Sequence, residues 1–420
     1  MNSVDEIFQA LGGVTEVGRI IGKRAEHVGS MKARGSIPVA YWPPIIAAAK
    51  ARGIPEITPE TLTRLHADAA TSRAALRSSK PTLFRWDAAR LNDLITGVPG
   101  LRVGHAHDER LGSGVTTLIF EAPAIASIAV HGGAPGLRDA ALLEPSMTIE
   151  RVDALVLSGG SVYGLDSMGG VAAFLRESGR GYAVRDIKVP IVPGAILFDL
   201  LNGGDKSFGR EPVYWHLGYR AASEAAADFA LGSAGAGYGA TTADLKGGLG
   251  SASEATSGGF RVGTLVAVNA LGRATIGEGP HFWAAPYEKN GEYGGLGWPA
   301  PWPADALDFR IKGDAAENTT IAIVATDAAL TKPEAKRLAT MAHDGMARAL
   351  RPSHACFDGD TIFSAATGTA KKLPSIRDRI EIGMTAADCL ARAIARAVYE
   401  AEPLPFPGAL PSWRGKFEGR

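Results

Sequence analysis

The stretch of sequence that decides the fold reads Glu317-Asn318-Thr319-Thr320-Ile321-Ala322-Ile323-Val324-Ala325-Thr326-Asp327. The apolar, β-branched run from Thr320 to Thr326 predicts a buried strand. The polar pair Asn318-Thr319 stands immediately before this run, so we expect a hydroxyl group at the start of a core strand. A threonine that merely begins a strand is the ordinary alternative.

A second polar-to-apolar junction follows at Phe357-Asp358-Gly359-Asp360-Thr361-Ile362-Phe363. At the start of a strand, Asp358 and Asp360 share one face, because side chains alternate. Paired carboxylates can hold an ammonium and a hydroxyl group in place, and they move each other's pKa values apart. The alternative is a turn with solvated charges. A calcium loop is excluded because no ligand series and no closing glutamate follow.

A threonine hydroxyl is a weak nucleophile unless a base lies beside it. A threonine at a new N-terminus carries its own base, an α-amine with a pKa of about 8. We therefore interpret Thr319 as a nucleophile that is released when the chain cuts itself after Asn318. The Thr319 hydroxyl would attack the preceding carbonyl in an N→O acyl shift, and the strain that Asn318 tolerates would help.

Three more residues are candidates for this site. Tyr163 lies in the turn 158–165, where glycines let a helix N-terminus approach a substrate, and its hydroxyl could donate to an oxyanion. Asn269 ends the predicted strand 262–269 and could supply a second donor. Lys206, after Asp205, could balance the two aspartates. A common strand-to-helix turn is the alternative at Tyr163, and the turn lacks the Gly-x-Ser-x-Gly pattern.

Composition narrows the class of protein. The chain has 420 residues with 44 basic and 44 acidic side chains, which excludes a polybasic coat for nucleic acid or membranes. Two cysteines, Cys356 and Cys389, cannot form a disulfide framework, so we expect a reducing, cytoplasmic location without membrane spans. We interpret 105–108 and 235–239 as structural, and expect neither a metal site nor a cofactor.

Three segments are predicted along the chain. Residues 1–66 form a small helical unit that resembles the Cro/YdaS type of helix-turn-helix. The resemblance implies a DNA-recognition helix carrying Arg24, Lys32 and Arg34. The unit has 8 basic and 6 acidic residues, which gives only a small excess of positive charge for binding DNA phosphates. The alternative is therefore a helical packing module that does not bind DNA. Residues 67–90 read as a linker, and 91–420 as the main domain.

The main domain is predicted to be α+β, because strands come in runs with helices between the runs. We expect a hairpin of two strands, 115–120 and 125–131, and a long lid or loop at 280–308. The tail after Pro403 is expected to lie on the surface. The predicted helices span 162–177, 215–229, 331–350 (which begins with a capping box) and 385–401.

Together these motifs resemble the self-processing aminopeptidase family, which includes L-aminopeptidase/D-esterases, β-peptidyl aminopeptidases and 6-aminohexanoate-oligomer hydrolases. The matching pieces are 97–105, 157–165, 246–250, 266–269, 318–330 and 343–368. The resemblance implies a four-layer αββα sandwich like that of N-terminal-nucleophile hydrolases, an α chain ending at Asn318, a β chain of residues 319–420, and a tetramer of αβ units. The pattern of Thr319, Asp358, Asp360 and Lys206 is similar to the nylon-oligomer branch, whereas the aminopeptidase branch uses serine after glycine.

We therefore expect an autoprocessed hydrolase of N-terminal aminoacyl amides or peptides that works through an acyl-enzyme without a cofactor. Two alternatives stay open. One is an endo-acting hydrolase of ω-amino-acid oligomers such as those of 6-aminohexanoate. The other is a DNA-binding regulator whose hydrolase-like part senses a small peptide or amide ligand.

Overall fold

The structure is a computed structural model that describes residues 3–33, 37–65, 93–313 and 318–419. Backbone contacts divide the chain into two compact units, Met1–Arg85 and Trp86–Arg420, which are described separately. The predicted linker 67–90 lies outside the described residues. Within the described residues, no helix combines the length and the apolar character needed to cross a membrane.

The N-terminal unit is helical. Ser3 caps its first helix by accepting a hydrogen bond from the Glu6 backbone N–H, and Gly22, with a φ of 66°, ends the second helix in the left-handed conformation that favours glycine. Its buried core includes Phe8, Val28 and Ile45. The helices are α1 (Val4–Ala10), α2 (Val14–Ile21), α3 (Ala25–Ala33) and α4 (Trp42–Ala51), with a 3₁₀ turn η1 (Val39–Tyr41) before α4.

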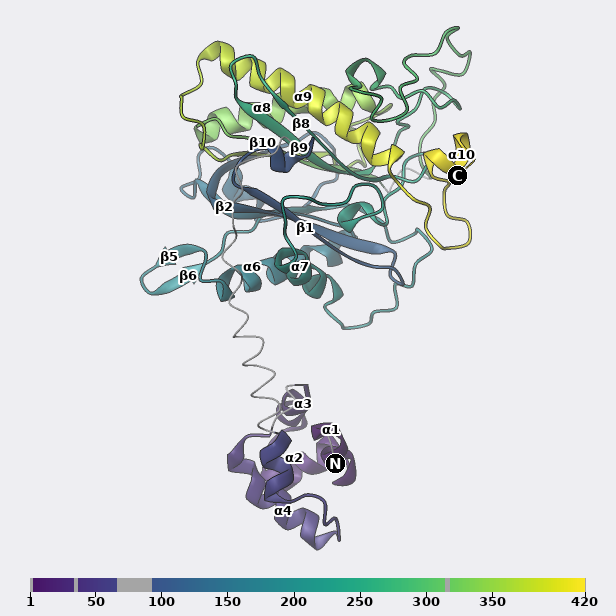
Figure 1. Ribbon diagram of the computed structural model, residues 1–420. Helices are drawn as coiled ribbons and strands as arrows, with labels where there is room; N and C mark the ends of the chain where they lie inside the picture. The colour runs from purple at the N-terminus through teal and green to yellow at the C-terminus, as the bar shows by residue number, and fades with distance from the viewer. Residues whose placement is uncertain (1–2, 34–36, 66–92, 314–317, 420) are drawn as a thin grey trace. The chain divides into compact units, whose positions relative to one another are not determined.

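The second unit has four layers (Figure 1). Helices α6 (Ser167–Glu177) and α7 (Val213–Ser223) cover one face of the strands, and α8 (Lys332–Ala349) and α9 (Ile376–Tyr399) cover the opposite face. A buried apolar cluster fills each of the three spaces between layers. The α+β, four-layer prediction is thereby confirmed.

All the described strands except β5 and β6 form one continuous network of hydrogen bonds. Its order is β3-β7-β4-β2-β11-β10-β9-β8, and β1 pairs with β2 beside this path. Strand β10 pairs antiparallel with β9 and parallel with β11. The bounds are β1 (Leu101–Asp108), β2 (Ser113–Val130), β3 (Gly136–Arg138), β4 (Arg151–Ser158), β7 (Gly194–Ile196), β8 (Gly248–Ala255), β9 (Arg261–Asn269), β10 (Thr319–Thr326) and β11 (Thr361–Ala366), with β5 (Tyr182–Val184) and β6 (Ile187–Val189) as a separate hairpin.

Strand β2 joins the two sheet layers. The predicted hairpin of 115–120 and 125–131 is wrong, because β2 runs without a turn from Ser113 to Val130. Its register shifts between Ile119 and Ala124, where Pro123 is exposed and needs no ladder hydrogen bond. The first half of β2 pairs with β1 and β4, and the second half pairs with β11.

Strand β10 is buried on both faces. Ile321, Ile323 and Ala325 point into the cluster between the two sheet layers. Ala322 and Val324 point into the cluster beneath α8 and α9. This double burial explains why the strand reads as a continuous apolar run and not as an alternating one.

Helix starts follow capping chemistry. The capping box predicted at Thr331 and Glu334 is present at the start of α8. Helix α9 begins at Ile376 and not near Thr385, because Ser375 and Asp378 form a second capping box upstream.

Two helix boundaries and the placement of the tail differ from the sequence prediction, whereas the segment 280–308 is a long loop as expected. The segment expected as a helix from 162 begins with a 3₁₀ turn, η4 (Ser161–Asp166), and α7 ends at Ser223, short of the predicted 229. The lid 280–308 contains only a single short 3₁₀ turn, η6 (Ala285–Tyr287). The tail is packed and not draped, because Trp413 of α10 (Trp413–Phe417) is buried and its Nε1 donates to the Pro280 carbonyl.

Close packing of α9 on β8 gives a stability prediction. A Cβ atom at Gly250 would lie 1.8 Å from the Ala393 carbonyl oxygen, so Gly250→Ala forces α9 away from the sheet. We expect a loss of about 2 kcal/mol, seen as a Tm lowered by several degrees in a thermal melt. Gly279→Ala is the control, because its nearest contact would be at 3.4 Å. Equal Tm values for the two variants would contradict the tight contact.

Candidate active site

Thr319 is the first residue of β10, and it lies in register with Asn269 on β9. The residue is 5% exposed. Thr319 Oγ1 donates a hydrogen bond to the carbonyl oxygen of Asn318, the residue before it. The hydroxyl therefore lies against the carbonyl that it would have to attack in order to cut the chain.

Gly359 also contacts this carbonyl group. Its backbone N–H donates to the Asn318 carbonyl oxygen at 3.3 Å. A Cβ atom at Gly359 would lie 2.6 Å from Thr319 Oγ1, so the position has no room for a side chain. The backbone N–H thus points at the oxygen where negative charge would develop during attack.

Asp358 and Asp360 flank Gly359, and each is only 1% exposed. Both residues precede β11 and are not part of it, because their backbone carbonyls accept hydrogen bonds from the loop that follows β2. The His131 and Gly132 N–H groups donate to the Asp360 carbonyl, and the Ala134 N–H donates to the Asp358 carbonyl. Their burial argues against a turn with solvated charges.

The two carboxyl groups have different surroundings. Asp360 Oδ1 accepts from the Thr320 N–H at 2.9 Å. Asp360 Oδ2 accepts from the His354 N–H at 2.9 Å and from His354 Nδ1 at 2.8 Å. Burial opposes charge on Asp360, but the hydrogen bonds from His354 and from the Asp358 carboxyl group outweigh it and lower the pKa of Asp360.

The pKa of Asp358 is shifted in the opposite direction. Burial, followed by the charge of Asp360, raises the pKa of Asp358 to about 9. Near neutral pH the pair therefore holds one proton, with Asp358 as the acid and Asp360 as the carboxylate. Such a pair can give or take a proton, and its bond to the Thr320 N–H lies one residue after Thr319.

Asn269 is fully buried and its amide is firmly oriented. Its Nδ2 donates to the Phe198 carbonyl at 2.8 Å, and its Oδ1 accepts from the Thr241 N–H at 3.0 Å and from Lys312 Nζ at 2.8 Å. Because Asn269 stands opposite Thr319 in the ladder, these bonds fix an amide next to the candidate nucleophile.

Lys206 is not brought to the aspartates. Its Nζ donates to the Leu111 carbonyl and, at 2.9 Å, to Asn202 Oδ1. Burial lowers the pKa of Lys206, while Asp199 is the first of the carboxylates that raise it. The expectation that Lys206 balances Asp358 and Asp360 does not fit this position, because the chain carries Lys206 to the Asp199 side.

Tyr163 lies in η4 and is 51% exposed. Its ring packs edge-on against Phe208, with ring centroids 5.3 Å apart. Within the described residues, no hydrogen bond joins the Tyr163 hydroxyl to Thr319, Asp358 or Asp360.

Lys246 belongs to the matching segment 246–250, but its sequence context did not predict a functional role for it. The side chain is fully buried, and its Nζ donates to the carbonyls of Gly237, Ala240 and Gly247 at 3.0, 2.8 and 2.8 Å. Burial lowers the pKa of Lys246 to about 7. The available sequence signal was a lysine placed directly before a buried Gly-Gly strand start.

A cavity of about 300 Å³ is lined in part by Lys246. Asn269 hydrogen-bonds three residues of its lining, Phe198, Thr241 and Lys312, so the cavity lies beside the amide opposite Thr319. The size is at the lower end of ligand pockets. Its polar lining residues include Asp199, Asn202, Lys246 and Lys312.

The candidate DNA-binding residues lie in the N-terminal unit. Arg24 is exposed immediately before α3. Lys32, in the last turn of α3, forms an ion pair with Asp5 at 2.8 Å. Arg34 lies outside the described residues. DNA binding by this unit stays a prediction.

Comparisons with known proteins agree on one family. Residues 93–409 match the family model described as peptidase family S58. An uncharacterized aminopeptidase of Mycobacterium tuberculosis is 39% identical over 346 residues, which cover 77% of this chain and 98% of the relative. A 6-aminohexanoate-oligomer endohydrolase of an Agromyces species is 27% identical over 78% of this chain and 88% of its own length.

Solved structures support the fold. A Burkholderia β-aminopeptidase matches with a TM-score of 0.57 and 22% identity, covering 77% of this chain and 91% of that chain. The L-aminopeptidase D-Ala-esterase/amidase of Ochrobactrum anthropi, described as a variant of the Ntn hydrolase fold, matches with a TM-score of 0.57 and 20% identity. It covers 76% of this chain and 90% of that chain.

The raised pKa of Asp358 predicts a pH-dependent stability. Between its ordinary pKa of about 4 and the folded-state value of about 9, the folded protein keeps a proton that the unfolded chain has lost. The free energy of unfolding therefore falls as the pH rises through this window. We expect the Tm of the Asp358→Asn variant to rise, relative to the Tm of the protein that keeps Asp358, as the pH rises.

Thermal melts across this pH window, made in chains that also carry Thr319→Ala so that their covalent state is the same, measure the effect. Asp139→Asn is the control, because Asp139 is an exposed carboxyl. Its Tm difference should stay constant with pH. A constant difference for Asp358→Asn as well would show that Asp358 is already ionised in the folded protein.

Proposed function

The chain belongs to peptidase family S58 and is a peptide hydrolase, and on that premise we propose an aminopeptidase whose nucleophile is Thr319, released when the chain cuts itself after Asn318. One observation carries the proposal. The Thr319 hydroxyl contacts the Asn318 carbonyl oxygen, and the same oxygen accepts a hydrogen bond from the Gly359 N–H. Nucleophile, target and oxyanion donor thus lie together in the intact chain.

Self-cleavage begins when Thr319 Oγ1 attacks the Asn318 carbonyl carbon. The Gly359 N–H stabilises the oxyanion, and the proton of the hydroxyl group passes to the neighbouring carboxyl pair and then to the departing Thr319 nitrogen. The C–O bond forms first, and the tetrahedral intermediate then collapses with cleavage of the C–N bond, which frees the α-amine of Thr319 and leaves an ester. Water hydrolyses the ester, giving a carboxylate at Asn318 and restoring the hydroxyl group of Thr319.

Substrate hydrolysis uses the same atoms. The new α-amine of Thr319 accepts the proton of Oγ1, which attacks the substrate carbonyl and forms an acyl-enzyme. The leaving amine takes the proton, and water releases the acyl group. Asn269 and Tyr163 are the proposed side-chain donors to the oxyanion, supported by the register of Asn269 with Thr319. Asp358 and Asp360 orient the ammonium and the hydroxyl groups of Thr319.

The proposed role of Lys206 is indirect. Its Nζ orients Asn202, which lines the cavity beside Asn269. The cavity is the proposed place for the aminoacyl part of the substrate, because it combines Asp199 with Lys312 and has room for a small peptide end.

An aminopeptidase substrate is favoured over an ω-amino-acid oligomer by the relatives. The aminopeptidase of M. tuberculosis shares 39% identity over 98% of its length, against 27% over 88% for the oligomer endohydrolase. A tetramer of αβ units stays a prediction, as does a DNA partner for residues 1–66.

Thr319→Ala tests the nucleophile. We expect this variant to remain one chain and to lose at least a factor of about a thousand in kcat/KM, because both reactions need Oγ1. The unchanged protein should run as two bands on a denaturing gel, and intact-mass analysis should find a chain that begins at Thr319.

Two controls accompany this variant. Thr319→Ser keeps a hydroxyl and should still cut itself, whereas Thr369→Ala removes an exposed hydroxyl group that bonds Thr367 and should leave cleavage and activity unchanged. Active protein that shows no chain starting at Thr319 contradicts the proposal.

A substrate panel tests the specificity. We expect hydrolysis of an aminoacyl p-nitroanilide with a free amine to exceed that of its N-acetylated counterpart by at least about tenfold, because one hydrogen bond to a charged group contributes about 1.5 kcal/mol or more. Absorbance of released p-nitroaniline measures both. Equal rates, together with internal cleavage of 6-aminohexanoate oligomers, would favour the endohydrolase instead.

A further inference from the structure

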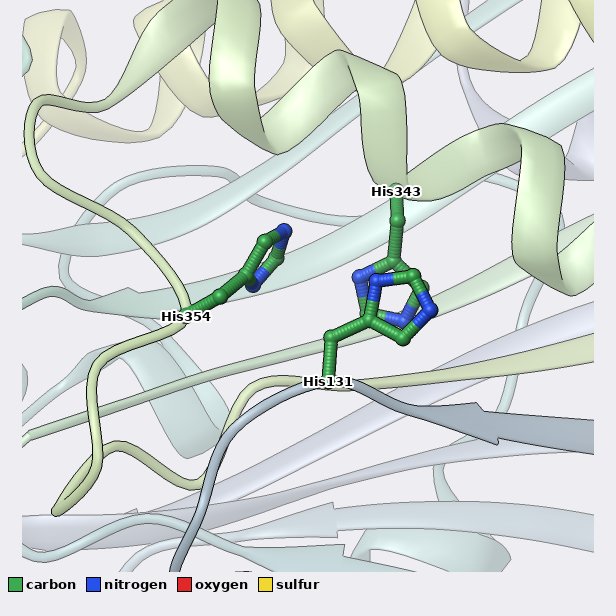
Figure 2. Close-up of side chains that lie close together, drawn as sticks. All are labelled: His131, His343 and His354. Atoms are coloured by element: carbon green, nitrogen blue, oxygen red, sulfur yellow. The ribbon is translucent and has the colours of Figure 1, made fainter.

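Three histidines, of which His131 is far from the other two in the sequence, lie close together (Figure 2), and one of them, His354, bonds to Asp360. His131 follows the end of β2, His343 lies on α8, and His354 lies in the loop that leads to Asp358. One ring nitrogen from each lies within 4.8 Å of those of the other two. No step of the proposed hydrolysis uses these nitrogens.

His343 supplies a buried lone pair. The residue is 2% exposed, and its Nε2 contacts the Ala129 carbonyl oxygen at 3.0 Å. Because a carbonyl only accepts, Nε2 carries the proton and Nδ1 is an acceptor. Within the described residues, Nδ1 is buried without a hydrogen-bond partner. A buried acceptor of this kind is costly unless something occupies it.

His354 supplies a second oriented lone pair. Its Nδ1 lies 2.8 Å from Asp360 Oδ2, so the Nδ1–H group donates a hydrogen bond to the ionised carboxylate, and Nε2 of the neutral ring is left as an acceptor. Histidines that bind metals are held in this way, with the other ring nitrogen donating to a carboxylate or a backbone carbonyl. His354 has the carboxylate partner and His343 has the carbonyl partner.

His131 completes the group from the solvent side. It is exposed, and its ring stacks on that of His343, with centroids 3.7 Å apart and an angle of 16° between the planes. A shared ion requires the exposed ring of His131 to tilt from this stack. The same exposure gives an ion a path from solvent.

We propose that His131, His343 and His354 bind a single divalent transition-metal ion of the Zn²⁺ class. Three neutral imidazoles suit Zn²⁺, Co²⁺, Ni²⁺ or Cu²⁺, whereas Mg²⁺ and Ca²⁺ prefer oxygen ligands. Three protein ligands leave a fourth tetrahedral position open to water on the His131 side.

The ion would stabilise the neighbouring site through one contact. His354 donates to Asp360, and Asp360 holds the Thr320 N–H at the start of β10. A metal on Nε2 polarises the imidazole and strengthens its Nδ1–H bond to the carboxylate. His354 is therefore a positioning residue for Asp360.

The test uses the full chain without a histidine tag, stripped with EDTA and titrated with Co²⁺. We expect visible d–d absorption bands that saturate at one ion per chain and are displaced by Zn²⁺. His131→Ala should weaken Co²⁺ affinity at least tenfold. The matched control is His216→Ala, an exposed histidine on α7, which should bind as the unchanged protein does.

Co²⁺ bands that are absent, or equal affinity in the His131→Ala and His216→Ala variants, overturn the proposal. His131 is exposed, so its variant is expected to fold, and a thermal melt checks this. Binding is also measured in Thr319→Ala, because the ion site does not depend on chain cleavage. Failure of the metal site and failure of the proposed nucleophile are therefore seen in separate experiments.

Discussion

The pairing of β10 with its two neighbours is the constraint on which the whole site depends. The antiparallel ladder with β9 sets Thr319 opposite Asn269. The parallel ladder with β11 brings the segment before that strand alongside Asn318, so that Gly359 reaches the Asn318 carbonyl. A slip of one residue in either ladder would turn the hydroxyl of Thr319 to the opposite face of the sheet.

The second element of the site is an electrostatic asymmetry between two buried carboxyl groups. Asp360 accepts hydrogen bonds from the Thr320 N–H and from His354, whereas burial and the charge of Asp360 keep Asp358 protonated. Two adjacent carboxyl groups without such a difference in partners would compete for one proton on equal terms. The protein thereby keeps an acid and a base together at the start of β10.

Both features rely on the four-layer packing. Strand β2 belongs to both sheet layers, and the loop that follows it, from His131 to Ala134, binds the backbone of Asp358 and Asp360. Helix α8 packs over the same end of the sheet and brings His343 to His131 and His354. The carboxyl pair is therefore held between a strand end, a helix and a loop, which leaves little freedom for rearrangement.

The sequence by itself determined the elements whose signals are local. Sequence patterns predicted the apolar run of β10, the capping box at Thr331 and the motifs of the family. Strand burial and helix caps depend on neighbouring residues, so they can be recognised in the sequence. The bend in β2 and the start of α9 were not, because an exposed proline in a bulge and one capping box among several polar residues are ambiguous locally. Only the tertiary structure decided that Lys206 turns to Asp199, that Lys246 is buried and that three histidines meet. These facts depend on distances between residues far apart in the chain, which packing sets.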